Sequence, residues 1–149
     1  MSSSSATSAG ALRGNDYDTA LCQQISELTG APAVSTIGAV REAIEAAGAT
    51  RIGVITPYVD ELNEKIKASI EADGVIVARV PGADIVDFAV SALGGLAASG
   101  AIELVFASCT NFGAMAARAV IAERLGVPVV TSNQAVLDAA LVRLNAVAA

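Results

Sequence analysis

Hydrophobic residues are spaced along this chain in two ways, one typical of buried strands and one typical of helices. Short apolar runs cover residues 52–56, 75–80, 103–107 and 127–131, and runs of this length bounded by turn residues predict strands. Between the runs, apolar residues recur every three or four positions, which predicts helices over 37–47, 59–70, 85–96, 113–125 and 134–145. Upstream, the pattern predicts a helix over 16–28 and a short extended segment over 32–36.

The regular alternation of strands and helices indicates the α/β class. Strands that are apolar at nearly every position are typical of a parallel sheet covered by helices on both faces. We therefore predict a three-layer αβα arrangement around a parallel sheet of four to five strands. At 149 residues, the chain has the length of one domain.

Polar side chains follow most of the predicted extended segments. At the carboxyl ends of the predicted extended segments, the chain has Ser35-Thr36, Thr56-Pro57-Tyr58, Pro81-Gly82, Ser108-Cys109-Thr110-Asn111 and Thr131-Ser132-Asn133. Four of these five are rich in hydroxyl and amide groups, and none contains Lys or Arg. Because ligands of open α/β sheets bind beyond the carboxyl ends of the strands, we expect a small polar pocket there.

Cys109 is the candidate reactive group of this pocket. It lies between a predicted strand and a predicted helix, where free amides and the positive end of the helix dipole stabilise a thiolate. The same amides can bind a substrate anion. The alternative interpretation is that Cys109 is only a small buried apolar residue at a strand end.

Composition excludes several other kinds of chemistry and partner. The chain has no His and two Cys, so we expect no metal site of the usual zinc type and no His-dependent catalytic triad. No strand is followed by a glycine-rich nucleotide-binding loop, and we expect no cofactor. A net charge of −6 and an aromatic content of 3% argue against a nucleic-acid partner.

The cellular setting is predicted from the same residues. No apolar segment reaches the length of a membrane span without a charge or a breaker, so we expect no membrane partner. The Ser-rich start has neither the basic region nor the apolar core of a secretory signal. Cys22 and Cys109 have no paired spacing, which favours reduced thiols and a cytoplasmic location.

Three segments together resemble a known superfamily. They are RIGVITPYVDELNE at 51–64, SCTN at 108–111 and GVPVVTSNQA at 126–135. In this order they are similar to the aspartate/glutamate racemase superfamily, specifically its branch of maleate cis-trans isomerases and arylmalonate decarboxylases. The likeness extends upstream through 16–18 and 28–36, and so covers nearly the whole chain.

The resemblance implies a site between two similar α/β lobes, with Cys109 as the thiol of the second lobe. It implies that the Tyr58 hydroxyl binds a substrate carboxylate, and that Thr110 and Asn111 offer amides and side chains to the same anion. Thr56 and Ser132 are further candidates for substrate binding, with Thr131 and Asn133 near the pocket. Simpler alternatives are a strand-end tyrosine at Tyr58 and helix caps at Asn111 and Asn133.

The chain also departs from the family pattern. It begins about where the first lobe's catalytic Cys loop is expected, so we interpret residues 1–36 (a Ser-rich start, a helix and a short strand) as a remnant of a first lobe, and residues 37–149 as a flavodoxin-like α/β lobe. Cys22 falls inside the helix over 16–28 and is not expected to replace the first thiol. The segment 80–84 is a short Pro-Gly turn where relatives have a longer one.

Three hypotheses follow. The leading one is a cofactor-independent, cysteine-dependent isomerase or racemase that acts on a small mono- or dicarboxylate, similar to maleate cis-trans isomerase. The second is a single-thiol decarboxylase of the arylmalonate type, because decarboxylation of a malonate needs only one thiol to protonate the enediolate. The third is a truncated or non-catalytic α/β domain. We expect a homo-oligomer, because a missing lobe leaves an apolar face to be covered.

Overall fold

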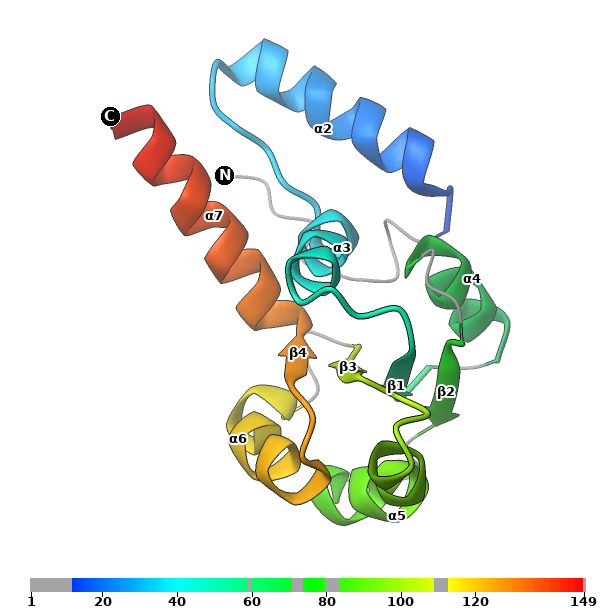
Figure 1. Ribbon diagram of the computed structural model, residues 1–149. Helices are drawn as coiled ribbons and strands as arrows, with labels where there is room; N and C mark the ends of the chain where they lie inside the picture. Colours follow the sequence, from blue (N-terminus) through cyan, green and yellow to red (C-terminus); the bar gives the residue numbers. More distant parts are fainter. Residues whose placement is uncertain (1–11, 59, 71–73, 80–83, 109–112, 149) are drawn as a thin grey trace.

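The computed structural model describes residues 12–148, except residues 59, 71–73, 80–83 and 109–112 (Figure 1). The elements in chain order are α2 (Asn15–Thr29), α3 (Thr36–Ala46), β1 (Ile52–Thr56), α4 (Asp60–Ile70), β2 (Ile76–Arg79), α5 (Ile85–Ala98), β3 (Leu104–Ala107), α6 (Ala114–Leu125), β4 (Val129–Thr131) and α7 (Ser132–Ala148). The four strands of the described chain form one parallel sheet in the order β2-β1-β3-β4. The predicted α/β class and parallel sheet are confirmed.

The sheet is buried between two layers of helices. Helices α3, α4 and α7 lie on one face and α5 and α6 on the other (Figure 1). Because successive side chains of a strand point to opposite faces, Leu104 and Phe106 of β3 join the cluster beneath α3, α4 and α7, whereas Val105 and Ala107 join the cluster beneath α5 and α6. All positions of β1 and β3 are buried, as the apolar runs predict.

Local signals in the sequence account for most helix ends. The Asp84 carboxylate accepts a hydrogen bond from the backbone N–H of Asp87 and so caps α5. Gly30 ends α2 in the left-handed region with φ 66°, a conformation that glycine adopts without steric cost.

The predicted short strand at 32–36 is wrong. Residues 32–35 are irregular, Thr36 already belongs to α3, and the Ser35 hydroxyl accepts the N–H of Gly38 as the cap of that helix. The Ser-rich start and the Pro81-Gly82 turn lie outside the described residues.

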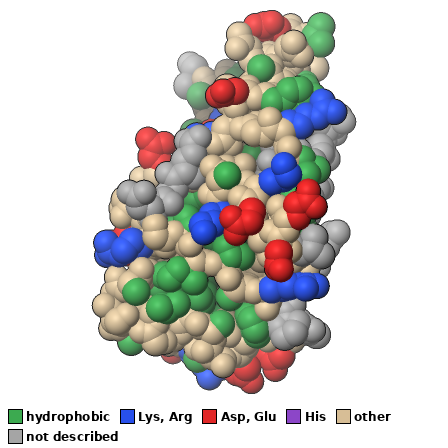
Figure 2. Space-filling model, turned by 90° about the vertical axis from the view of Figure 1, so that its right-hand side faces the viewer, with side chains coloured by type: hydrophobic (Ala, Val, Ile, Leu, Met, Phe, Trp, Pro, Cys, Tyr) green, Lys and Arg blue, Asp and Glu red, His purple; other side chains and the backbone are tan. Residues whose placement is uncertain are grey.

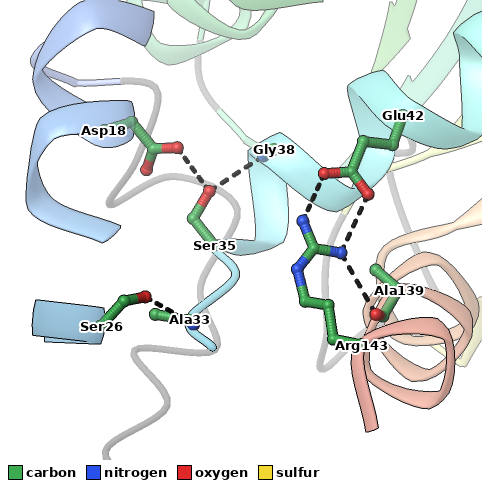
Figure 3. Close-up of polar contacts among 8 residues, drawn as sticks. All are labelled: Asp18, Ser26, Ala33, Ser35, Gly38, Glu42, Ala139 and Arg143. Atoms are coloured by element: carbon green, nitrogen blue, oxygen red, sulfur yellow. Dashed lines mark hydrogen bonds and ion pairs between the residues drawn. The ribbon is translucent and has the colours of Figure 1, made fainter. Parts of the chain in front are cut away.

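Helix α2 is attached to the rest of the molecule through polar contacts (Figure 3). The Ser35 hydroxyl donates a hydrogen bond to the carboxylate of Asp18. The backbone N–H of Ala33 donates to the Ser26 hydroxyl at 2.9 Å. Among the described residues, neither hydrophobic cluster contains a side chain of residues 15–29. The helix therefore lies beside the α/β unit without contributing to its core.

The face on the side of α4 and β2 is shown in Figure 2. Acidic and basic side chains are interspersed across its middle, and a group of hydrophobic side chains lies below them. Within the described ranges, no helix is long and apolar enough to cross a membrane.

Candidate active site

A row of three buried hydroxyl groups crosses the carboxyl-terminal edge of the sheet. Ile55 of β1 pairs with Ala107 of β3, and Ala107 pairs with Thr131 of β4. One residue further along each strand, this register aligns Thr56, Ser108 and Ser132, all three of which are fully buried. The backbone N–H of Ser108 donates to the carbonyl of Ile55 at 2.9 Å, which extends the pairing beyond the end of β3.

The hydroxyl row lies on the face covered by α3, α4 and α7. Thr56 and Ser108 are each two positions beyond a side chain of that cluster, and residues two apart on a strand share a face. The Ser108 hydroxyl is buried and has no hydrogen-bond partner within the described part of the chain. Because a buried unpaired polar group is costly, its presence at this edge marks a position that a ligand or water can satisfy.

Tyr58 is held by a turn that the Thr56 hydroxyl stabilises. The backbone N–H of Tyr58 donates to the Thr56 hydroxyl oxygen at 3.1 Å, and the side-chain amide of Asn63 donates to the carbonyl of Tyr58 at 3.2 Å. The Tyr58 ring is half-buried and packs against the cluster beneath α3, α4 and α7. Thr56 and Asn63 thus fix the backbone that presents Tyr58 at the strand end.

Ser132 opens α7 directly after β4. The preceding Thr131 hydroxyl accepts the backbone N–H of Gln134 at 3.1 Å, so Thr131 occupies the capping position that the sequence suggested for Asn133. The Thr131 side chain lies on the opposite face of the sheet from the hydroxyl row, because its hydroxyl contacts the sulfur of Met115 in α6 at 3.4 Å. The amino end of α7, beside Ser132, carries the positive end of a helix dipole.

Sequence reasoning missed two residues of this region. Asn63 is a buried amide whose Oδ1 has no partner among the residues described here, and its signal was a polar residue on the buried face of a helix. Arg118 of α6 donates from Nε to the carbonyl of Val129 at 3.0 Å. It brings a positive charge beside β4, and no local signal in the sequence predicted this position.

Cys109, Thr110 and Asn111 lie outside the described residues. Their flanks are placed: Ser108 belongs to the hydroxyl row, and α6 begins at Ala114, which is buried. The three predicted site residues therefore connect the buried edge of β3 to the start of α6.

The environment of Cys22 does not favour a catalytic thiol. As predicted, Cys22 lies in a helix, α2, and its side chain is partly buried. Burial raises the pKa of its thiol, and the nearby charge of Asp18 raises it further, while Ser35 and Arg143 oppose the shift. A raised pKa leaves less thiolate at neutral pH, and the thiolate is the reactive form.

Two other features do not add to the site. Within the described chain, no group of three or more acidic or Cys side chains is arranged to hold a metal ion. A surface cavity of about 480 Å³ lies between the start of α2 and the second half of α4, lined by residues that include Arg13, Asn15, Lys65 and Ser69. None of its lining residues belongs to the hydroxyl row.

Comparison with known proteins identifies relatives along almost the whole chain. The sequence pattern of the arylmalonate decarboxylase family matches residues 3–148. The arylmalonate decarboxylase of Bordetella bronchiseptica is 31% identical over 143 residues, which are 87% of this chain and 58% of that protein.

Solved structures agree with this assignment. A crystal structure of arylmalonate decarboxylase superposes with a TM-score of 0.82 at 29% identity, covering 93% of this chain and 64% of the other. A maleate isomerase from Pseudomonas putida shares the fold, with a TM-score of 0.73 at 24% identity over 93% of this chain and 62% of that one. The chain thus spans about three fifths of the length of these relatives, and it belongs to the arylmalonate decarboxylase family.

Proposed function

We propose that this protein is a cofactor-independent enzyme that decarboxylates a small malonate-type dicarboxylate, with the thiol of Cys109 as the proton donor. The observation that carries the proposal is the family match over 3–148, in which Cys109 follows a buried row of hydroxyl groups at the carboxyl edge of a parallel sheet. The identity of 31% to a decarboxylase favours this reaction over the isomerisation suggested by the motifs alone.

The reaction needs little from the protein besides anion stabilisation and one proton. The bond between the α-carbon and one carboxylate breaks, CO₂ leaves, and the electron pair forms an enediolate on the remaining carboxylate. Hydroxyl and amide donors at the strand ends stabilise the two oxygens of this enediolate in a site with little water. The Cys109 thiol then gives its proton to the α-carbon, and the thiolate regains a proton from solvent.

The described residues supply positioning for these steps. Thr56 and Asn63 hold the backbone of Tyr58, whose hydroxyl we propose binds the retained carboxylate. Ser132 at the amino end of α7 and the amides of Thr110 and Asn111 are proposed as further donors to the same anion.

A second candidate reaction is cis-trans isomerisation of maleate. The SCTN and TPY segments favour it, because they resemble the maleate isomerase branch more closely than the decarboxylase branch. In that reaction the Cys109 thiolate adds to the double bond, the single bond that results rotates, and elimination releases the thiolate again.

Turnover assays on the purified chain distinguish these proposals. We expect release of CO₂ from phenylmalonate and a loss of about 10²–10⁴-fold in Cys109→Ala, the usual contribution of a positioned acid. Cys22→Ala is the matched control and should retain full turnover. Phenylmalonate turnover that survives Cys109→Ala, or its absence in the unaltered protein, contradicts the decarboxylase proposal. Turnover of maleate in place of phenylmalonate supports the second candidate.

A further inference from the structure

Asn63 is a polar residue on a helix face that suits apolar side chains. Helix α4 buries Asn63 together with Ile66, Ser69 and Ile70, and Asn63 is 5% exposed. A buried amide is costly unless its polar groups are hydrogen-bonded, and the Oδ1 of Asn63 has no such partner among the residues that the structure describes. An apolar side chain would fill this position without that cost. The cost indicates that the amide has a task other than packing.

The side-chain amide of Asn63 joins α4 to the end of β1. Its Nδ2 donates to the carbonyl of Tyr58 at 3.2 Å, five residues upstream and outside the helix. From the other side, the hydroxyl of Thr56, which is fully buried at the last position of β1, accepts the N–H of Tyr58 at 3.1 Å. Both polar groups of the Tyr58 backbone are therefore held by side chains that are themselves buried.

The two contacts restrain Tyr58 in different ways. Thr56 bonds a residue two positions away, which is a local turn of the kind that Thr hydroxyls stabilise. Asn63 reaches back from the helix, so its contact fixes Tyr58 relative to α4 as a whole. The Tyr58 ring packs against the hydrophobic cluster to which Ile66 of α4 belongs. Asn63 thus ties a side chain at the strand end to the packed core.

We propose that Asn63 is a positioning residue for carboxylate recognition, because by holding the Tyr58 backbone it directs the Tyr58 hydroxyl toward the carboxylate that the substrate retains. The inference rests on the proposed function, in which this hydroxyl binds that carboxylate. Asn63 acts through Tyr58 and not by contact with the substrate. Since hydrogen bonds are directional, a displaced hydroxyl binds the carboxylate less tightly. The retained carboxylate is anionic in the substrate as well as in the enediolate, so the loss raises KM more than it lowers kcat.

Tyrosine fluorescence tests the positioning step without any turnover. The chain has no Trp and two Tyr, so Tyr17→Phe leaves Tyr58 as its only tyrosine. In this background, Asn63→Leu should lower the fluorescence anisotropy of Tyr58 and increase its quenching by acrylamide, because Leu fills the buried position but donates no hydrogen bond. Asn63→Ala removes the same donor with a smaller side chain and should give the same changes. Ser69→Ala, which alters another buried polar residue of α4, is the control and should leave both signals unchanged.

Steady-state kinetics test the link from Asn63 to the substrate. Asn63→Leu should raise the KM for phenylmalonate about tenfold, as expected when a hydrogen bond to a charged group is weakened, with a smaller change in kcat. In a Tyr58→Phe background, which lacks the hydroxyl, the same substitution should raise KM no further. A purely structural role of Asn63 would instead raise KM equally in both backgrounds.

The two experiments separate this inference from the proposed function. Unchanged anisotropy and quenching of Tyr58 in folded Asn63→Leu and Asn63→Ala, with circular dichroism as the check on folding, overturn the inference whatever the turnover. An equal rise in KM with and without the Tyr58 hydroxyl overturns it as well. Absence of phenylmalonate turnover in the unaltered chain contradicts the proposed function instead, and the fluorescence of Tyr58 still decides whether Asn63 positions it.

Discussion

Asp18 is a carboxylate buried between two helices, and its effect extends to the neighbouring thiol. It accepts a hydrogen bond from Ser35, whose hydroxyl also caps α3. Its negative charge disfavours the thiolate of Cys22 and so contributes to the raised pKa of that thiol. The same carboxylate thus joins α2 to the body and adds to the effect of burial on the pKa of Cys22.

Replacing this charge should make Cys22 more reactive. In a Cys109→Ser background, Asp18→Asn should lower the pKa of Cys22, because the amide keeps the acceptor oxygen and removes the charge. We expect the rate of alkylation by iodoacetamide near neutral pH to rise a few-fold, and the pH-rate curve to move to lower pH. Asp16→Asn, which neutralises an exposed residue of the same helical turn, is the control. An unchanged curve for Asp18→Asn would refute the charge effect.

Among the secondary-structure elements, β1 and β3 are also linked by a side chain near their amino ends. The Glu103 carboxylate accepts the backbone N–H groups of Thr50 and Arg51, at 3.0 and 3.3 Å, and pairs with the Arg51 guanidinium at 2.6 Å. These hydrogen bonds stabilise the charged carboxylate and so lower the pKa of Glu103 below its ordinary value of 4.5. The pair is exposed, so its contribution to the free energy of unfolding is small.

The sign of the pH effect follows from the lowered pKa. A carboxylate whose pKa is lower in the folded state stabilises the fold above pH about 4.5 and loses this contribution as the pH falls below that value. Glu103→Gln should therefore lower the urea midpoint at neutral pH, and the difference from the unaltered protein should shrink in acid. Glu64→Gln on the exposed side of α4 serves as the control. A difference that grows in acid would contradict the assignment.

Much of the element order was predictable because the two central strands, β1 and β3, are fully buried. The runs at 52–56 and 103–107 could be recognised as strands since both faces of β1 and β3 are covered. Helix α7 begins earlier than predicted because Thr131 caps it. The hydroxyl groups at the strand ends were visible in the sequence. The alignment of Ser108 with Thr56 and Ser132 was not, because it depends on the strand register.

At the scale of the whole molecule, the orientation of α2 was the feature that periodicity could not predict. The spacing of Tyr17, Leu21, Ile25 and Leu28 identifies an apolar stripe, and the usual expectation is that such a stripe faces the core. The contacts of Asp18 and Ser26 instead turn the polar side of α2 toward the body, and the apolar stripe stays partly exposed. The molecule therefore has a well-packed α/β unit and a helix joined to it by a few polar groups.

This division predicts unequal resistance to local opening. Elements with few buried apolar contacts open at a lower free-energy cost than core strands. We expect amide hydrogen exchange in α2 to be much faster than in β1 and β3, because the described side chains of α2 belong to neither hydrophobic cluster.

Removing the polar link should affect α2 alone. Asp18→Ala takes away the carboxylate that joins α2 to Ser35 but leaves Ser35 free to cap α3, so exchange should accelerate in α2 and stay unchanged in β1 and β3. Ser99→Ala, which removes the hydrogen bond from Ser99 to the carbonyl of Leu96 at the end of α5, is the control and should leave α2 unaffected. Exchange mass spectrometry resolves these peptides. Equal acceleration of α2, β1 and β3 in Asp18→Ala would show instead that α2 unfolds together with the core.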